Sequence, residues 1–324
     1  MRYNVVVQRT LCNPKSAAHK LNAQPTVRSS VFARLARGVL GYLRAARPPC
    51  VLPLASCLLL VFCVLLAACA PQPLTVTREP VALGLVAADS CGPLAEALVA
   101  AYEESHPWVT VEVTVFDDAV AERTLRAGEA DMALLSWLGG SGDEGPLWSH
   151  EFARSGIAVI VHPSTPFVET GLAHLQQIFR GHVQEWGGMV LAVVSREDGS
   201  GARAAFEGVV LGDYAVTPTS VVMSSSEAVV EYVARTPGAI GYVSTLWLGE
   251  SERDRLRVLP VEEALPTLEA LADGSYPMSH PLYLASVAEP GGEAREFAQW
   301  VLGPEGQAIT VRFTLPQVLE PAGG

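Results

Sequence analysis

VVSREDGSGARAAF, residues 193–206, joins an apolar run to a helix-forming segment through a Gly/Ser turn. The apolar residues 191–194 are typical of a short strand, and Gly199 and Gly201 allow the backbone to turn tightly. Ser200 suits the N-cap of the helix that the following alanines favour. The stretch therefore predicts a strand, a turn and a helix, the repeating unit of an α/β fold.

The same stretch carries groups that bind an oxyanion. A helix start presents unpaired N–H groups and the positive end of the helix dipole. Arg196 adds a planar set of donors that matches a tetrahedral oxyanion, and Asp198 is placed to hold that side chain. An ordinary turn with an exposed arginine has the same spacing, so these residues alone leave an anion site and a plain junction equally open.

Length and charge limit the class of protein. A chain of 324 residues allows two domains. Residues 1–68 hold nine basic residues and no acid, whereas the rest has 13 arginines against 34 acids, a formal charge of −21. Such an acidic body argues against nucleic acid or an anionic membrane surface as its partner. Any anion must be held by local dipoles and one or two arginines.

The body offers few groups for metal or covalent chemistry. Cys91 is its single cysteine, which excludes an internal disulfide and a cysteine-based metal site there. The histidines have no HExxH-like spacing, so we expect neither a metal nor a cofactor. Ser200 lies between adjacent glycines, unlike the Gly-x-Ser-x-Gly elbow of hydrolases. Because no nucleophile–base–orienter set is apparent, we do not expect an enzyme.

The residues before the body resemble an export signal. Arg44 and Arg47 precede the apolar run 51–68, and the sequence LAAC that ends at Cys69 is similar to a bacterial lipobox. Cys69 is therefore the expected lipidation site. The alternative is an uncleaved transmembrane anchor, which a run of 18 residues can just support. Either interpretation places the acidic body outside the cytoplasm.

Strand-like and helix-like runs alternate along the body, separated by short loops, which predicts an α/β fold with a largely parallel sheet in each domain. The expected strands are 81–87, 108–116, 131–136, 156–161, 191–194, 218–223, 239–242 and 282–287. The expected helices are 94–102, 120–127, 172–179, 202–207, 228–235, 263–271, 294–302 and 305–312. Ser136 ends a buried run, and ligands gather at such strand ends in open α/β sheets.

Four segments together resemble the phosphate-binding proteins of ABC phosphate-uptake systems, which have the type II periplasmic-binding-protein fold. They are IFRGHVQEW (178–186), REDGSGARAAF (196–206), TPGAIGYV (236–243) and YPMSHPLY (276–283). They are similar to the family patterns IF.G.I..W, R.DGSGT...F,.PGAIGY and YP..RPLY and occur in the family's order. The resemblance covers roughly residues 80–316.

The resemblance implies two α/β lobes with an anion-binding cleft between them. Lobe one would comprise 74–154 plus 246–320 and lobe two 155–245, after a basic leader and lipoprotein signal at 1–68. It implies a lipid-anchored, monomeric solute-binding protein that captures inorganic phosphate and delivers it to an ABC permease.

The resemblance also implies which residues contact the ligand. Arg196 would pair with the anion and Asp198 would orient Arg196. Two loops and one strand end would complete the site: Ser90 and Cys91 in the first loop, Ser200, Gly201 and Ala202 in the second, and Ser136 at the strand end.

Two of these positions depart from the family pattern. Ala202 replaces the usual threonine, which removes a hydroxyl and keeps the N–H. Ser136 replaces an aspartate that accepts the proton of monohydrogen phosphate, whereas a serine hydroxyl is neutral and can also donate. Losing a charge-assisted bond of roughly 1.5–3 kcal/mol weakens phosphate binding and relaxes its discrimination from sulfate. Sulfate or molybdate as ligand, and a sensor or adaptor without a transport role, stay open as alternatives.

Overall fold

The computed structural model of the chain describes residues 78–139 and 145–316. The leader, the apolar run 51–68 and the lipidation candidate Cys69 lie outside the described residues, so the predictions made for them stay predictions. Among the helices of the described ranges, none has both the length and the apolar character that crossing a membrane requires.

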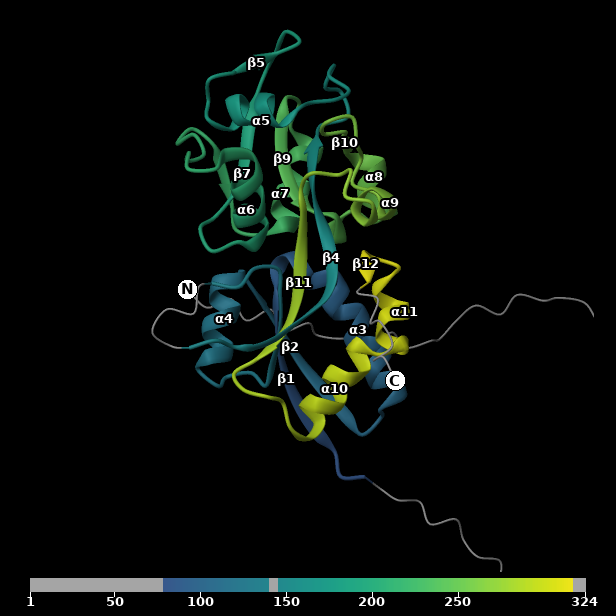
Figure 1. Cartoon of the computed structure of the whole chain (residues 1–324). Helices are drawn as coiled ribbons and strands as arrows, with labels where there is room; N and C mark the ends of the chain where they lie inside the picture. The colour runs from purple at the N-terminus through teal and green to yellow at the C-terminus, as the bar shows by residue number, and fades with distance from the viewer. Residues whose placement is uncertain (1–77, 140–144, 317–324) are drawn as a thin grey trace, which may run out of the picture. The chain divides into compact units, whose positions relative to one another are not determined.

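A ten-stranded sheet forms the centre of the described chain (Figure 1). Its order is β2-β1-β3-β11-β4-β9-β7-β8, and β10 and β12 also pair with β4. These strands are β1 (Val81–Ala88), β2 (Val109–Phe116), β3 (Met132–Leu135), β4 (Trp148–Val161), β7 (Ala192–Arg196), β8 (Val221–Met223), β9 (Ala239–Ser244), β10 (Arg257–Leu259), β11 (Ser279–Ser286) and β12 (Leu315–Pro316). A separate antiparallel pair consists of β5 (Glu185–Trp186) and β6 (Met189–Val190).

Two groups of parallel strands flank the antiparallel strands β4 and β11. β1 pairs in parallel with β2 and β3, and β7 pairs in parallel with β8 and β9. β4 pairs with β11 as far as Gly156 and with β9 from Ile157 onward, so it belongs to both groups. We call the part around β1–β3 lobe one and the part around β7–β9 lobe two. The lobe bounds given above stay a prediction.

Helices alternate with these strands along the chain, as the sequence predicts. The α-helices are α3 (Gly92–Ser105), α4 (Asp118–Arg126), α5 (Leu172–Phe179), α6 (Gly201–Phe206), α7 (Ser226–Arg235), α8 (Glu250–Arg255), α9 (Leu268–Ala272), α10 (Gly292–Leu302) and α11 (Pro304–Thr310). Two 3-10 turns, η1 (Asp89–Cys91) and η3 (Thr245–Trp247), and one π-helical turn, η2 (Glu207–Leu211), complete them.

Each lobe has its own apolar core beneath the polar loops described below. In lobe one, Leu94, Leu98 and Tyr102 recur at four-residue spacing on α3 and are fully buried against the strands. In lobe two, the rings of Phe206 and Tyr242 stack with their centroids 4.1 Å apart. Burying each such side chain stabilises the fold by about 1.5–3 kcal/mol.

One strand begins well before its predicted start. β4 begins at Trp148, whereas the apolar run alone predicts a strand from 156. Its first half mixes polar and apolar residues without alternation, because its register against β11 shifts at a bulge between Leu282 and Tyr283. α8 contains no buried residue.

Candidate functional site

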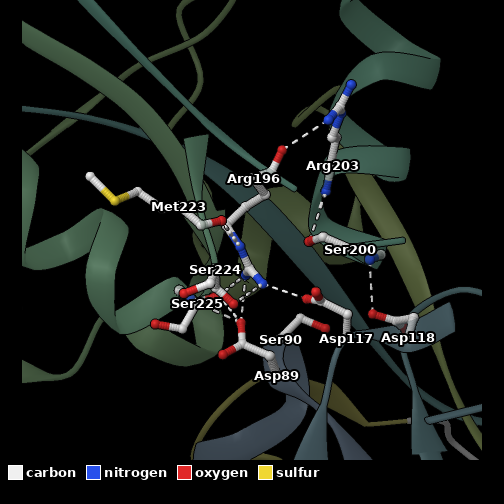
Figure 2. A network of polar contacts seen from close by, with 12 residues as sticks. Asp89, Ser90, Asp117, Asp118, Arg196, Ser200, Arg203, Met223, Ser224 and Ser225 are labelled. Atoms are coloured by element: carbon white, nitrogen blue, oxygen red, sulfur yellow. Dashed lines mark hydrogen bonds and ion pairs between the residues drawn. The ribbon is translucent and has the colours of Figure 1, made fainter. Parts of the chain in front are cut away.

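Polar residues from both lobes meet where several strands end (Figure 2). Asp89 follows β1, Asp117 follows β2 and Ser136 follows β3, all in lobe one. Arg196 ends β7 in lobe two. Parallel strands have their carboxyl ends at the same edge of a sheet, so the lobe-one groups lie together at that edge. This is where open α/β sheets bind ligands.

Arg196 is the centre of this contact and is only 1% exposed. Its Nη1 lies 2.6 Å from Asp89 Oδ2 and its Nη2 lies 2.5 Å from Asp117 Oδ1. The remaining donors go to three groups in lobe two: Ser226 Oγ at 3.0 Å and the carbonyl oxygens of Met223 and Ser224, both at 3.2 Å. All five N–H groups of the guanidinium thus donate within the protein.

Asp89 ties lobe one to two elements of lobe two. Its Oδ2 accepts hydrogen bonds from Arg196, from Ser226 N at 2.9 Å and from Ser226 Oγ at 2.5 Å. Ser226 is the first residue of α7, so the carboxylate also lies at a helix start, where a negative charge is stabilised. The main-chain oxygen of Asp89 accepts a further bond from Trp247 Nε1.

Asp117 is the second carboxyl group on Arg196. Burial and a hydrogen bond with Glu197 raise the pKa of Asp117 to about 7, although the positive charge of Arg196 acts in the opposite direction. The negative charges of Glu197 and Asp89 add to the rise. The pKa of Asp117 therefore lies well above that of an ordinary aspartate.

Asp118, the first residue of α4, lies in a set of converging donors. Its Oδ1 accepts from Ser136 N at 2.7 Å, Trp137 N at 2.9 Å and Ser136 Oγ at 3.0 Å, and its Oδ2 accepts from Gly201 N at 2.8 Å. We call these four donors the donor cradle. Burial raises the pKa of Asp118, and the hydrogen bonds from the cradle oppose that rise. Since every partner is a donor, the geometry suits the carboxylate form.

The first predicted loop, Ser90 and Cys91, is fully buried next to the cradle. Ser90 Oγ donates to Ser136 Oγ over 2.6 Å, so Ser90 supports the hydroxyl that bonds Asp118. Cys91 is the N-cap of α3, and burial raises the pKa of its thiol well above the usual range. A buried neutral thiol is unreactive.

The second predicted loop, Ser200 to Ala202, also lies where the two lobes meet. Ser200 is the N-cap of α6, as predicted, and its hydroxyl accepts from Arg203 N. Gly201 brings its N–H to Asp118. A Cβ on Gly201 would overlap Ser136 Oγ and Asp118 Oδ2, so this close approach requires glycine. Ala202 packs its side chain into the apolar core of lobe two.

The predicted role of Asp198 is wrong. Its side chain is 93% exposed and pairs with Arg203 Nη1 at 2.7 Å, not with Arg196. The cause is the turn: Gly199 has a φ of +92°, and the chain reverses there so that Asp198 faces the first turn of α6. Asp89 and Asp117 orient Arg196 instead. Arg203 steadies the turn through a bond to the main-chain oxygen of Arg196.

Three residues of this site were not predicted as site residues: Asp89, Asp117 and Asp118. Each carries a signal in the sequence, because Asp89 directly follows one apolar strand and Asp117 and Asp118 directly follow the alternating strand that ends at Phe116. The strand-end rule that identifies Ser136 applies equally to them. Within residues 78–139 and 145–316, no group of three or more His, Cys, Asp or Glu side chains is arranged to hold a metal ion.

Comparisons with known proteins agree with this fold. The chain is 28% identical over 219 residues to the phosphate-binding protein PstS of Bacillus subtilis, an alignment that covers 64% of this chain and 71% of that protein. A putative phosphate ABC transporter substrate-binding protein of Clostridium perfringens, solved with bound phosphate, has a TM-score of 0.69 at 27% identity. That match covers 74% of this chain and all of the other.

A phosphate transport receptor of Vibrio cholerae matches in fold, with a TM-score of 0.59 at 24% identity over 72% of this chain and 99% of that one. These relatives are binding proteins and not enzymes, in line with the missing nucleophile–base–orienter set. The model of the PBP superfamily domain matches residues 76–305, most of the body. The chain therefore belongs to the PBP superfamily and has its mixed α/β fold, as predicted.

Proposed function

We propose that the protein is an extracytoplasmic solute-binding protein that captures an oxyanion, foremost phosphate, between its lobes and delivers it to an ABC permease. The observation that carries the proposal is the donor cradle: three main-chain N–H groups and one hydroxyl, drawn from both lobes, surround a single oxyanionic group. Similarity to the Clostridium perfringens protein, whose structure contains phosphate, supports the choice of ligand.

In this proposal the ligand takes the position that the Asp118 carboxylate holds. The cradle supplies neutral donors and Arg196 supplies the cation once it releases an aspartate. Neutral dipoles suit this acidic body, because they hold an anion without a general positive field. The contacting residues would be Ser90, Cys91, Ser136, Trp137, Arg196, Ser200, Gly201 and Ala202.

The attachment to the membrane is part of the same proposal. Lipidation of Cys69 after cleavage of the apolar run would hold the body at the outer face of the membrane, close to a permease. The proposal also includes a monomeric state. Lobe one would comprise 74–154 plus 246–320, and lobe two 155–245.

Titration calorimetry of the full chain in detergent with phosphate, sulfate and molybdate tests the ligand. We expect binding heat from phosphate at lower concentration than from sulfate. Heat from sulfate or molybdate with none from phosphate would assign the protein to another oxyanion and overturn the phosphate proposal.

A second candidate function is a sensor or adaptor that has the same fold and no transport role. It is favoured by one observation, namely that both the cradle and Arg196 already have partners within the protein. No heat from any of the three anions, together with a melting temperature that phosphate leaves unchanged, would favour this candidate over solute capture.

A further inference from the structure

The Asp118 carboxylate has the contacts of a bound oxyanion. Two main-chain N–H groups and a hydroxyl of lobe one bind its Oδ1, and a main-chain N–H of lobe two binds its Oδ2, all within 2.7–3.0 Å. The residue is 1% exposed. A neighbouring main-chain bond, from Ala119 N to Gly199 O at 3.0 Å, fixes the same two segments together. The carboxylate thus joins the lobes as a shared ligand would.

The cradle has no room for a second anion. A single Cβ added to Gly201 would overlap both Ser136 Oγ and Asp118 Oδ2, so the atoms around this N–H are already in contact. Phosphate can bond the cradle donors only after the Asp118 carboxylate has left them.

The carboxyl groups around the cradle also disfavour the binding of an additional anion. Asp89, Asp117 and Asp118 contribute three carboxyl groups against the single guanidinium of Arg196, and all five of its N–H groups are in use. In a buried environment, like charges a few ångströms apart repel strongly. A phosphate dianion added beside them is disfavoured, whereas one that replaces a carboxylate is not.

We propose that Asp118 is an internal ligand that sets the affinity of the site: its carboxylate fills the oxyanion position between the lobes, and phosphate binds by displacing it. This inference rests on the proposed function and deepens it. The apparent dissociation constant is then the intrinsic one divided by the fraction of molecules whose cradle is vacant. A cradle vacant in about one molecule in ten weakens binding about tenfold.

The test compares Asp118→Ala with the wild type and with Glu104→Ala, a matched control that removes an exposed carboxylate from α3 of the same lobe. Phosphate is titrated into each full chain by calorimetry. Without phosphate, hydrogen exchange of the segments 116–126 and 196–206 is followed by mass spectrometry. We expect Asp118→Ala to bind phosphate at least about tenfold more tightly and to exchange faster in both segments, and Glu104→Ala to behave as the wild type.

The outcomes separate this inference from the proposed function. If the wild type binds phosphate and Asp118→Ala binds it equally or more weakly, the inference is overturned and the function stands. If no variant binds phosphate, the function fails, and faster exchange in Asp118→Ala would still support the internal ligand, whereas unchanged exchange would overturn it as well.

Asp118→Asn provides a second variant in case the alanine variant fails to fold. An asparagine can accept from Ser136 and Trp137 with its oxygen but turns an NH₂ group toward the N–H of Gly201, which is a repulsive contact. We expect its phosphate affinity to lie between those of the wild type and Asp118→Ala. Affinity no higher than in the wild type would contradict the proposal.

Discussion

At the scale of single residues, the site consists of a buried arginine and the carboxyl groups that contact it. Arg196 is almost completely buried and pairs with Asp89 and Asp117, which come from the other lobe. Removing two charges from water costs several kcal/mol per ion, which good geometry and further hydrogen bonds must offset. Here five N–H donors are used and Asp89 receives three hydrogen bonds. In this structure these contacts hold the two lobes together.

The variant Arg196→Ala tests how much these contacts contribute to stability. It leaves two buried carboxyl groups without their cation, so we expect the free energy of unfolding to fall by about 3–5 kcal/mol. Urea unfolding followed by circular dichroism measures it. Arg123→Ala removes an exposed arginine of α4 and should change stability by less than about 0.5 kcal/mol. A loss below about 1 kcal/mol in Arg196→Ala would show that the pair is not a structural tie.

A second residue-scale prediction concerns His280 on β11. The residue is 6% exposed, and neither ring nitrogen has a hydrogen-bond partner among the described residues. Burial, with a smaller effect of Arg154, lowers the pKa of His280 to about 4. The unfolded chain therefore binds a proton near pH 6.5 that the folded chain binds only near 4. The stability that comes from keeping His280 neutral in the folded chain is fully present above pH 6.5. It is lost as the pH falls toward 4.

His280→Leu removes that proton-linked loss. We expect the variant to unfold at a higher temperature than the wild type at pH 5 and to lose most of this advantage at pH 8. Differential scanning calorimetry at both values measures it. An advantage that is equal at both pH values would indicate that His280 is not held neutral by burial.

At the scale of elements, the sequence predicts the strands and helices well and the site only in part. Apolar runs and caps are local, so β1, α3 and α5 lie where expected, and Ser200 is the predicted N-cap. Partner choice is not local. Asp198 is two residues from Arg196 in sequence, yet a glycine turn directs it away, and the aspartates that hold Arg196 lie 79 and 107 residues earlier. Only the folded chain brings them together.

The start of α6 makes an element-scale prediction. Gly201→Ala places a methyl group against Ser136 and Asp118, so the two lobes must shift apart there. We expect a loss of about 1–3 kcal/mol in the free energy of unfolding, typical of overpacking. Gly208→Ala, in η2 of the same lobe, meets nothing within 4 Å and should leave stability unchanged or raise it by about 0.4–1 kcal/mol. Equal effects of the two changes would show that the approach at Gly201 is not tight.

At the scale of the whole molecule, charge separates the leader from the body. All lysines lie in residues 1–68 together with seven arginines, and every acidic residue follows them. A basic flank stays on the cytoplasmic side of an apolar run, and an acidic body is repelled by anionic lipid headgroups. If the proposed function is right, a body of formal charge −21 needs an attachment other than its own surface to remain near a membrane permease. We propose that Cys69 supplies this attachment.

Cys69→Ser tests the attachment in the full-length chain. A serine cannot form the thioether of a bacterial lipoprotein, so we expect the variant to keep its leader and to incorporate no labelled fatty acid in a bacterial host. Intact mass of the membrane fraction and metabolic labelling measure the two effects. Cys63→Ser is the matched control, since it removes a thiol six residues earlier in the same apolar run and should mature normally. If Cys69→Ser were cleaved and labelled like this control, lipidation would take place at another residue and the lipobox assignment would be wrong.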